Sequence, residues 1–309
     1  MPKRVAVIDI GSNSIKILVA EGPGVKPVFE RTLETRLSPG PDEPQDAISE
    51  RALAAGVGAV AALLPYADLH GAEKIAVVAT SMVREASNGA EFAEAVCDAT
   101  GERLRILSGD EEAAGIASGV ATDPAFKGAA RLGIFDLGGG SLEFIHRVDG
   151  KVRTALSHRV GAVRMTRKFV LKPEAPVSAA ELAAVRNEVN ALFAPVLAGA
   201  LKTGPVALAG CGGAFSAARA MLGARAGKGA RETDAFLSVA ALNELLHEVS
   251  SKPLDARIAI PGVPAARADI LPAAFATLLE LAELAKAPGF THSWRNLRYG
   301  LAAGLLAGR

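Results

Sequence analysis

Cysteine is scarce in this chain of 309 residues, which contains only Cys97 and Cys211. The two cysteines form neither a CxxC pair nor a cysteine and histidine cluster with the spacing of a zinc site. Such sparse use indicates a reducing compartment, and we expect the protein in the cytoplasm.

An excess of charge of either sign is also lacking. Lysine and arginine total 34, aspartate and glutamate total 33, and the formal net charge is +1. A chain this close to neutral is not expected to bind nucleic acid or a membrane surface in a general way. Any site for a polyanion must therefore be a local patch.

Long uninterrupted apolar runs are missing as well. Residues 1–9 enter a strand pattern at once and carry charges, which is wrong for a signal peptide. The alanine-rich segments 273–287 and 300–307 are short and are broken by charge, glycine or proline. We therefore expect no membrane partner.

What the chain does contain is a glycine-rich motif at 133–144, with the sequence Gly-Ile-Phe-Asp-Leu-Gly-Gly-Gly-Ser-Leu-Glu-Phe. Ile134 and Phe135 suit a buried strand, and the glycines at 138–140 allow a tight turn whose N–H groups approach an anion. Asp136 stands at the strand end, where a carboxylate typically positions Mg²⁺ or water beside a phosphate. The simpler alternative is a hairpin in which the aspartate only caps the turn.

A second copy of this motif favours the phosphate interpretation. The copy begins at Val5 and lies 127 residues earlier in the chain. Two phosphate hairpins this far apart predict two related domains that face one another across a shared ligand cleft, and the length of the chain agrees with two hydrophobic cores. The corresponding residues are Asp9 and Asp136, Gly11 and Gly138, and Ser14 and Ser141.

Strand and helix patterns alternate along the chain, which predicts an α/β fold. The part after residue 215 has mostly helical patterns. Expected strands are 4–10, 15–20, 28–37, 74–79, 103–107, a hairpin at 131–148, and 152–157; expected helices are 52–64, 88–100, 108–120, 178–201 and 295–307.

Four further segments are suited to a site. Thr80 to Ala86 directly follows a predicted buried strand, where open α/β sheets place ligand-binding groups. Glu111 and Glu112 begin a helix, a position where acidic residues usually only complement the helix dipole. Four cations lie between 159 and 168 around a predicted turn, and form either a solvated face or an anion patch. The glycine-rich turn at 210–213 suits a phosphate, a nucleoside or a tight crossover.

The paired turns resemble the two phosphate motifs of the superfamily of acetate and sugar kinases, heat-shock chaperones and actin. Further motifs follow along the chain: Ala79-Thr80-Ser81 with Arg84, Leu107-Ser108-Gly109 with Glu112, Gly161-Ala162-Val163-Arg164, and Arg267-Ala268-Asp269. Their order over nearly the whole chain resembles that of the exopolyphosphatase and guanosine pentaphosphate phosphatase family.

The resemblance implies two ribonuclease-H-like (actin-like ATPase) domains that face an interdomain cleft, a requirement for Mg²⁺, and a homodimer. We expect residues 1–122 to form the first domain, with a helix at about 295–309 packing back on it, and 123–294 to form the second. The implied activity is release of orthophosphate from the ends of inorganic polyphosphate, with guanosine pentaphosphate as the alternative substrate. The chain resembles the short form of the family, without an additional helical region.

The resemblance also assigns roles to residues. Glu112 corresponds to the glutamate that activates water, Arg84 to an arginine that faces the phosphates, and Asp9 and Asp136 to metal-side carboxylates, Asp136 being catalytic as well. The cations Arg164, Arg167 and Lys168 are candidates for binding a phosphate chain. The two phosphate loops are Gly11, Ser12, Asn13 and Ser14, and Gly138, Gly139, Gly140 and Ser141.

These residue types suit phosphoanhydride hydrolysis, which needs positioning, charge neutralisation and a carboxylate to deprotonate water. No histidine lies in the motifs, so a covalent intermediate on Ser14 or Ser141 is not expected. Two other classes stay open. One is a kinase of the same superfamily, which would turn over ATP with an acceptor, and the other is an actin-type nucleotide switch, which would polymerise.

Overall fold

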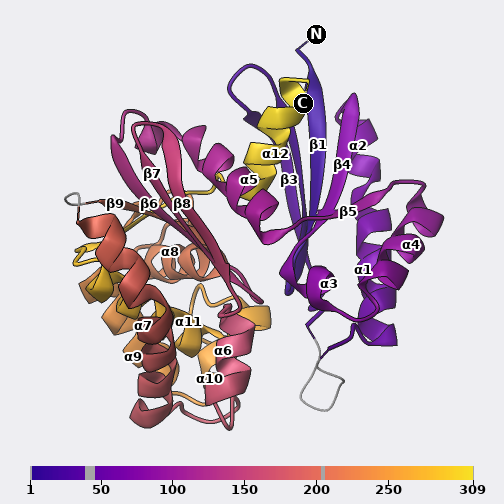
Figure 1. The fold of residues 1–309 in the computed structure, drawn as a ribbon. Helices are drawn as coiled ribbons and strands as arrows, with labels where there is room; N and C mark the ends of the chain where they lie inside the picture. The colour runs from indigo at the N-terminus through magenta and orange to yellow at the C-terminus, as the bar shows by residue number, and fades with distance from the viewer. Residues whose placement is uncertain (1, 39–45, 203–205, 309) are drawn as a thin grey trace. The chain divides into compact units, whose positions relative to one another are not determined.

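The computed structural model describes residues 2–38, 46–202 and 206–308. The chain divides into two compact units (Figure 1). Unit 1 comprises residues 1–127, 155–157 and 295–309, and unit 2 comprises residues 128–154 and 158–294. The first crossing between them thus falls a few residues after the predicted position at 122, because the turn at 124–126 with buried Phe126 packs on the preceding helix.

Unit 1 is built on a mixed sheet of five strands in the order β3-β2-β1-β4-β5. The first three strands are antiparallel, whereas β4 and β5 run parallel to β1. The strands are β1 (Arg4–Ile10), β2 (Ser14–Glu21), β3 (Lys26–Glu34), β4 (Lys74–Ala79) and β5 (Leu104–Ile106).

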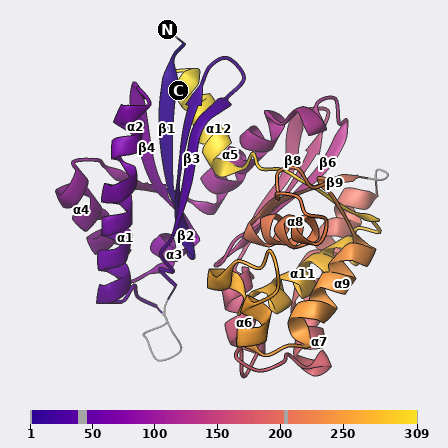
Figure 2. The same cartoon turned by 180° about the vertical axis from the view of Figure 1, so that it is seen from behind.

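Helices cover both faces of this sheet. Figures 1 and 2 show α1, α2 and α4 on one face and α5 and α12 on the other. Alternate residues of β1 accordingly belong to two cores: Ile8 packs with Val60 and Phe92, and Val7 packs with Tyr299. The helices are α1 (Glu50–Leu63), α2 (Pro65–Leu69), α3 (Ser81–Glu85), α4 (Gly89–Thr100), α5 (Gly109–Ala121), the 3₁₀ turn η1 (Pro124–Phe126) and α12 (Leu297–Leu306).

The contact between α5 and α12 is unusually close. A Cβ on Gly119 would lie 1.9 Å from the carbonyl oxygen of Asn296, and a Cβ on Gly300 would lie 1.8 Å from the carbonyl oxygen of Gly115. Glycine is therefore required at these positions so that the two backbones can touch. This contact joins the C-terminal helix α12 to α5 of unit 1, although the two helices are far apart in the sequence.

The expectation that no stretch approaches a membrane span needs correction. The helical stretch Glu50–Leu69 is long and apolar enough by length and composition, which core helices of other proteins also satisfy. The sequence pattern predicts a helix that ends at residue 64, before Pro65, whereas proline at the first position of α2 lets the helical path resume. Ala52, Val60 and Leu63 of α1 are buried on the sheet.

Unit 2 contains a six-stranded sheet in the order β10-β11-β9-β6-β7-β8. The hairpin of β6 and β7 is antiparallel, and β9 runs parallel to β6, which repeats the plan of unit 1. The strands are β6 (Arg131–Leu137), β7 (Leu142–Val148), β8 (Lys151–His158), β9 (Ala207–Gly212), β10 (Phe236–Ser238) and β11 (Gly289–His292). The sequence patterns missed β10 and β11, because runs of three and four residues beside long helices carry little periodicity.

The core of unit 2 centres on α11, in which every residue from 271 to 282 is buried. A helix that is apolar all round must lie inside, and α11 packs against α7, α9 and α6. Phe135 and Phe144 of the hairpin, with Phe193 and Phe290, extend this core to the sheet. The helices are α6 (Ala162–Phe169), α7 (Ala179–Leu201), α8 (Gly213–Arg225), α9 (Val239–Ser250), α10 (Leu254–Ile258), the 3₁₀ turn η2 (Ala265–Arg267) and α11 (Leu271–Leu284).

Candidate active site

The first phosphate turn connects β1 to β2 in unit 1. The Gly11 N–H donates to the Ser14 carbonyl at 3.1 Å, which closes the turn. Ser12, Asn13 and Ser14 are buried, and the Ser12 and Asn13 carbonyls accept hydrogen bonds from backbone N–H groups that follow β3. The Ser12 and Asn13 carbonyl groups of the turn are therefore already hydrogen-bonded to the protein backbone.

The second turn, between β6 and β7 in unit 2, has the same closure, with Gly138 N–H donating to the Ser141 carbonyl at 3.0 Å. Its carbonyls at 138, 139 and 140 accept from the backbone at residues 162, 163 and 161, at 2.9, 2.9 and 3.2 Å. A trans peptide points C=O and N–H in opposite directions. The N–H groups of Gly139, Gly140 and Ser141 therefore face away from α6, on one side of the turn. Convergent N–H groups of this kind form an anion-binding surface.

The segment that supplies those donors is a helix, which corrects the turn predicted around 159–168. Val163 and Met165 are buried in the unit 2 core, so the segment gains from helical packing despite its cations. Arg164 Nε donates to the Gly140 carbonyl at 2.8 Å and thus supports the phosphate turn. Arg167 is exposed, and Lys168 forms an ion pair with Glu188 at 2.6 Å.

The two aspartates of the repeat, Asp9 and Asp136, are the penultimate residues of β1 and β6 and are 9% and 7% exposed. Across the ladder, Asp9 is opposite Lys16, whereas Asp136 is opposite Glu143. Directly opposite residues have their side chains on the same face of the sheet. Glu143 is 2% exposed, and the sequence analysis missed it as a site residue. The sequence does contain a signal for Glu143. It occupies the position of Lys16 in the repeat, so the second copy has a carboxylate where the first has a cation.

Arg84 and Glu112 meet in unit 1. Arg84, on the short helix after β4, donates from Nη1 to the Leu107 carbonyl at 2.6 Å and to Glu112 Oε2 at 3.0 Å. Glu112 is 6% exposed. The Thr80 N–H donates to the Ile10 carbonyl and connects this helix to the end of β1. The pair and the first phosphate turn thus both follow the carboxyl ends of parallel strands, where α/β sheets bind ligands.

Glu111 and Glu112 have different surroundings although they are adjacent. Glu111 is exposed and forms a capping box with Ser108, the residue that precedes α5. Hydrogen bonding from the Ser108 backbone holds the pKa of the Glu111 carboxyl below its usual value. The helix-capping explanation therefore accounts for Glu111 and leaves Glu112 as the buried carboxylate of the pair.

Beside Asp136 lies the turn between β9 and α8. Gly212 has a φ of +101°, and a Cβ there would lie 2.9 Å from Asp136 Oδ1. A Cβ on Gly213 would lie 1.7 Å from Nη1 of Arg267, so the guanidinium lies directly over this turn. Arg267 was part of a recognised motif but was not predicted as a site residue. The structure places its charge on the turn that borders Asp136.

A structure search identifies the architecture as the two-domain actin-like fold, and this prediction is confirmed. An exopolyphosphatase from Cytophaga hutchinsonii superposes with a TM-score of 0.88 over 99% of this chain and 98% of that chain, at 22% identity. At this identity the likeness concerns the fold.

The chain belongs to the Ppx/GppA phosphatase family, whose model matches residues 7–307. It is 28% identical over 269 residues to exopolyphosphatase 1 of Mycobacterium leprae, covering 86% of this chain and 78% of the relative. It is 26% identical over 299 residues to the guanosine-5'-triphosphate,3'-diphosphate pyrophosphatase of Vibrio vulnificus, covering 96% of this chain but 58% of that relative. The chain is accordingly a hydrolase of phosphoanhydride bonds.

Proposed function

We propose that the protein is a Mg²⁺-dependent exopolyphosphatase that releases orthophosphate from the ends of inorganic polyphosphate, with Glu112 activating water. The observation that carries this proposal is the ion pair between the partly buried Arg84 and the buried Glu112 in unit 1, whose segments, like the first phosphate turn, follow the carboxyl ends of parallel strands. Relatives named exopolyphosphatase support the substrate. The absence of histidine from the motifs supports direct attack by water.

In the proposed step, Glu112 accepts a proton from water while the water oxygen attacks the terminal phosphorus. The bond from that phosphorus to the bridging oxygen breaks, and the shortened chain leaves with the bridging oxygen. The products are orthophosphate and a polyphosphate one unit shorter. Charge on the transferring phosphoryl group lies on its outer oxygens, so catalysis depends on donors placed around them.

Arg84 has two tasks in this proposal. Its hydrogen bond to the Leu107 carbonyl fixes the guanidinium, which in turn orients the Glu112 carboxylate. A nearby arginine favours the charged form of a carboxylate, which is the form that accepts a proton. A bound phosphate would share the same guanidinium, because arginine presents several donors in one plane.

The carboxylates of the two hairpins suit Mg²⁺, a hard cation that is commonly held by one or two carboxylates together with substrate phosphates. In unit 2, the carboxylates of Asp136 and Glu143 are buried on one face of the sheet, and such adjacent carboxylates are stabilised by a cation. We propose that these two residues hold Mg²⁺ in unit 2, and that Asp9 is the candidate metal ligand of unit 1. Bound Mg²⁺ would neutralise phosphate charge.

Guanosine pentaphosphate is the second candidate substrate. The relative from Vibrio vulnificus aligns with 96% of this chain, which favours retaining this possibility. Both substrates present a terminal phosphoanhydride, and the phosphate turns contact only that part in our proposal.

A parallel assay of orthophosphate release from polyphosphate and from guanosine pentaphosphate tests the function. We expect faster release from polyphosphate, abolition by EDTA, and recovery with excess Mg²⁺. A rate that is unchanged by EDTA would refute the metal requirement. Faster release from guanosine pentaphosphate would reverse the substrate order, and transfer of phosphate from ATP to an acceptor would favour the kinase alternative.

A further inference from the structure

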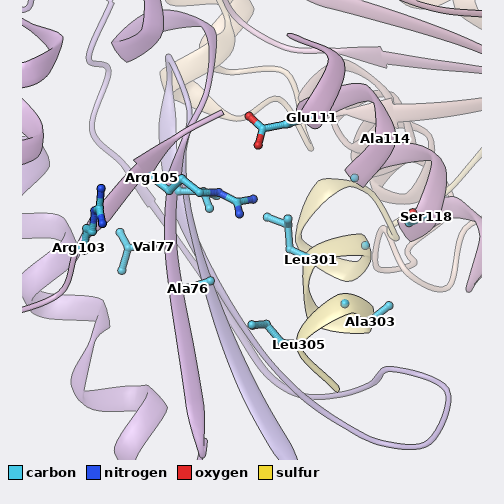
Figure 3. Close-up of a pocket in the computed structure, with 14 residues that line it drawn as sticks. Ala76, Val77, Arg103, Arg105, Glu111, Ala114, Ser118, Leu301, Ala303 and Leu305 are labelled. Atoms are coloured by element: carbon cyan, nitrogen blue, oxygen red, sulfur yellow. The ribbon is translucent and has the colours of Figure 1, made fainter. Parts of the chain in front are cut away.

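Unit 1 contains a cavity of about 520 Å³ away from its phosphate turn (Figure 3). The cavity lies against β4 and β5, between α5 and α12, on the sheet face opposite to α1 and α4. Its volume is within the range of small-molecule sites and is small for a protein partner. None of the residues assigned to phosphate binding or catalysis lines it.

The floor and one wall of the cavity are apolar. Ala76 contributes from β4 and Ala114 from α5, and Leu301 and Leu305 project from α12 toward the strands (Figure 3). Such a wall favours an apolar ligand body, because burying its surface removes it from water.

The rim of the cavity is charged at the β5 end. Arg103 and Arg105 are exposed, and neither donates a hydrogen bond or forms an ion pair within the described parts of the chain. Figure 3 shows Arg105 extending toward Leu301, with Glu111 on the neighbouring rim. The lining residues carry two guanidiniums and one carboxylate, that of Glu111, which interacts electrostatically with Arg105, so the rim has a net positive charge.

The lack of a side chain at Gly304 leaves part of the cavity open. A Cβ at this position in α12 would meet nothing within 4 Å, in contrast to Gly300 one turn earlier, whose Cβ would clash with the α5 backbone. Glycine in the interior of a helix is less favourable than alanine. Close packing explains Gly300 but does not explain Gly304, which widens the cavity.

We propose that this cavity binds a small amphipathic anion, with its apolar chain along α12 and its carboxylate on Arg105 and Arg103. A carboxylate is preferred to a neutral head group because arginine offers paired N–H donors that match two oxygens. The site adjoins the start of α5, where Glu111 is followed by Glu112. Binding here is therefore positioned to alter the segment that carries the proposed general base.

Titration calorimetry with decanoate tests the proposal directly. Decanol, of equal chain length without charge, and acetate, with the charge but without the chain, are the matched ligands. We expect decanoate to bind at least tenfold more tightly than either, which corresponds to about 1.4 kcal/mol. Equal binding of decanoate and decanol, or no binding of decanoate at millimolar concentration, would overturn the proposal.

Three variants locate the binding. Gly304→Leu fills the cavity and Arg105→Gln removes the charge, and each is expected to weaken decanoate binding at least tenfold. Gly58→Leu is the matched control, since Gly58 is a helical glycine of the same unit whose Cβ also meets nothing within 4 Å. Thermal unfolding verifies that all three fold. Unchanged decanoate binding by Gly304→Leu would refute the location. If the wild type does not bind decanoate but self-associates, and Gly304→Leu abolishes this self-association, the cavity is an interface between copies instead.

Discussion

Glu111 and Glu112 follow one another at the start of α5, and their side chains leave the helix about 100° apart. This rotation directs Glu111 to solvent and to its own capping box, and directs Glu112 to Arg84. Two residues of the same type therefore differ in burial and in partner. Replacing each glutamate in turn by glutamine, which has the same shape without the charge, therefore tests the proposed chemistry.

We predict that Glu112→Gln retains phosphate binding and loses turnover by roughly 10²–10⁴-fold, the contribution expected of a general base. Glu111→Gln is the control, because glutamine also completes a capping box, and its rate is expected to stay within a few-fold of the wild type. Steady-state orthophosphate release measures both. A Glu112→Gln enzyme with a near-normal rate would exclude this glutamate as the base.

The opposed pair of Asp136 and Glu143 leads to a second prediction. Glu143→Gln removes one of two adjacent buried carboxylates, and we expect a higher Mg²⁺ concentration for half-maximal activity. Asp9→Asn tests the carboxylate of the other unit in the same titration. If Asp9→Asn shifts the Mg²⁺ requirement and Glu143→Gln does not, the principal metal ligand lies in unit 1.

At the scale of elements, two glycines of α12 one turn apart have opposite surroundings. Gly300→Ala would place a Cβ 1.8 Å from the Gly115 carbonyl oxygen, and such overpacking is expected to lower the free energy of unfolding by at least about 1–3 kcal/mol. Gly304→Ala meets open space and should raise it by up to about 1 kcal/mol through helix propensity. Denaturant unfolding compares the two, and equal effects would contradict the close contact of α5 and α12.

Strand β11, which lies between β10 and β9 in the sheet, carries a buried histidine whose protonation opposes folding. Burial, together with the charges of Arg219 and Arg231, lowers the pKa of His292 from 6.5 to about 3. Between these values the unfolded chain binds the proton and the folded chain does not, so stability falls as pH decreases below about 6.5, by up to about 1.4 kcal/mol per pH unit.

Chemical denaturation between pH 4 and 7 measures this slope. His292→Gln should reduce the dependence of unfolding free energy on pH, and His247→Gln, at an exposed position of α9, should retain it. An unchanged slope in His292→Gln would show that other groups carry the acid sensitivity.

At the scale of the whole molecule, the chain passes between the units after residue 127, around 155–157 and after residue 294. If both phosphate turns bind the same phosphate chain, ligand binding must couple the two units, with bending confined to these crossings. We predict that Mg²⁺ with an unreactive polyphosphate analogue reduces the radius of gyration. Small-angle scattering measures it, and no change at saturation would reject gating by domain closure.

Cationic side chains give a further prediction at this scale. Arg167 is exposed on α6, whereas Arg164 supports the Gly140 carbonyl and Lys168 pairs with Glu188. If Arg167 and Lys168 bind the distal part of a polyphosphate chain, Arg167→Gln with Lys168→Gln should weaken long chains more than short ones and flatten the salt dependence of binding. Equal losses for long and short chains would contradict this role. Arg164 is left unchanged because its loss would also disturb the turn.

The sequence by itself determined the two hairpins, the α/β fold and, to within two residues, the bounds of α1, α4, α5, α7 and α12. These features depend on local signals: apolar strands with Asp9 and Asp136 as their penultimate residues, glycines that permit the turns, and capping residues such as Ser108. Local geometry obeys short-range sterics and hydrogen bonding, so a short window of sequence carries it. The repeat also indicated that two related domains exist.

Only the tertiary structure decided which side chains meet. It separated Glu112 from Glu111, placed Glu143 opposite Asp136 and Arg267 over Gly213, and formed a helix where four cations suggested a turn. These outcomes depend on strand register and on contacts between residues far apart in the chain. Burial of Val163 and Met165 against a distant core outweighs the local preference of a charged segment, and no short window of sequence contains that core.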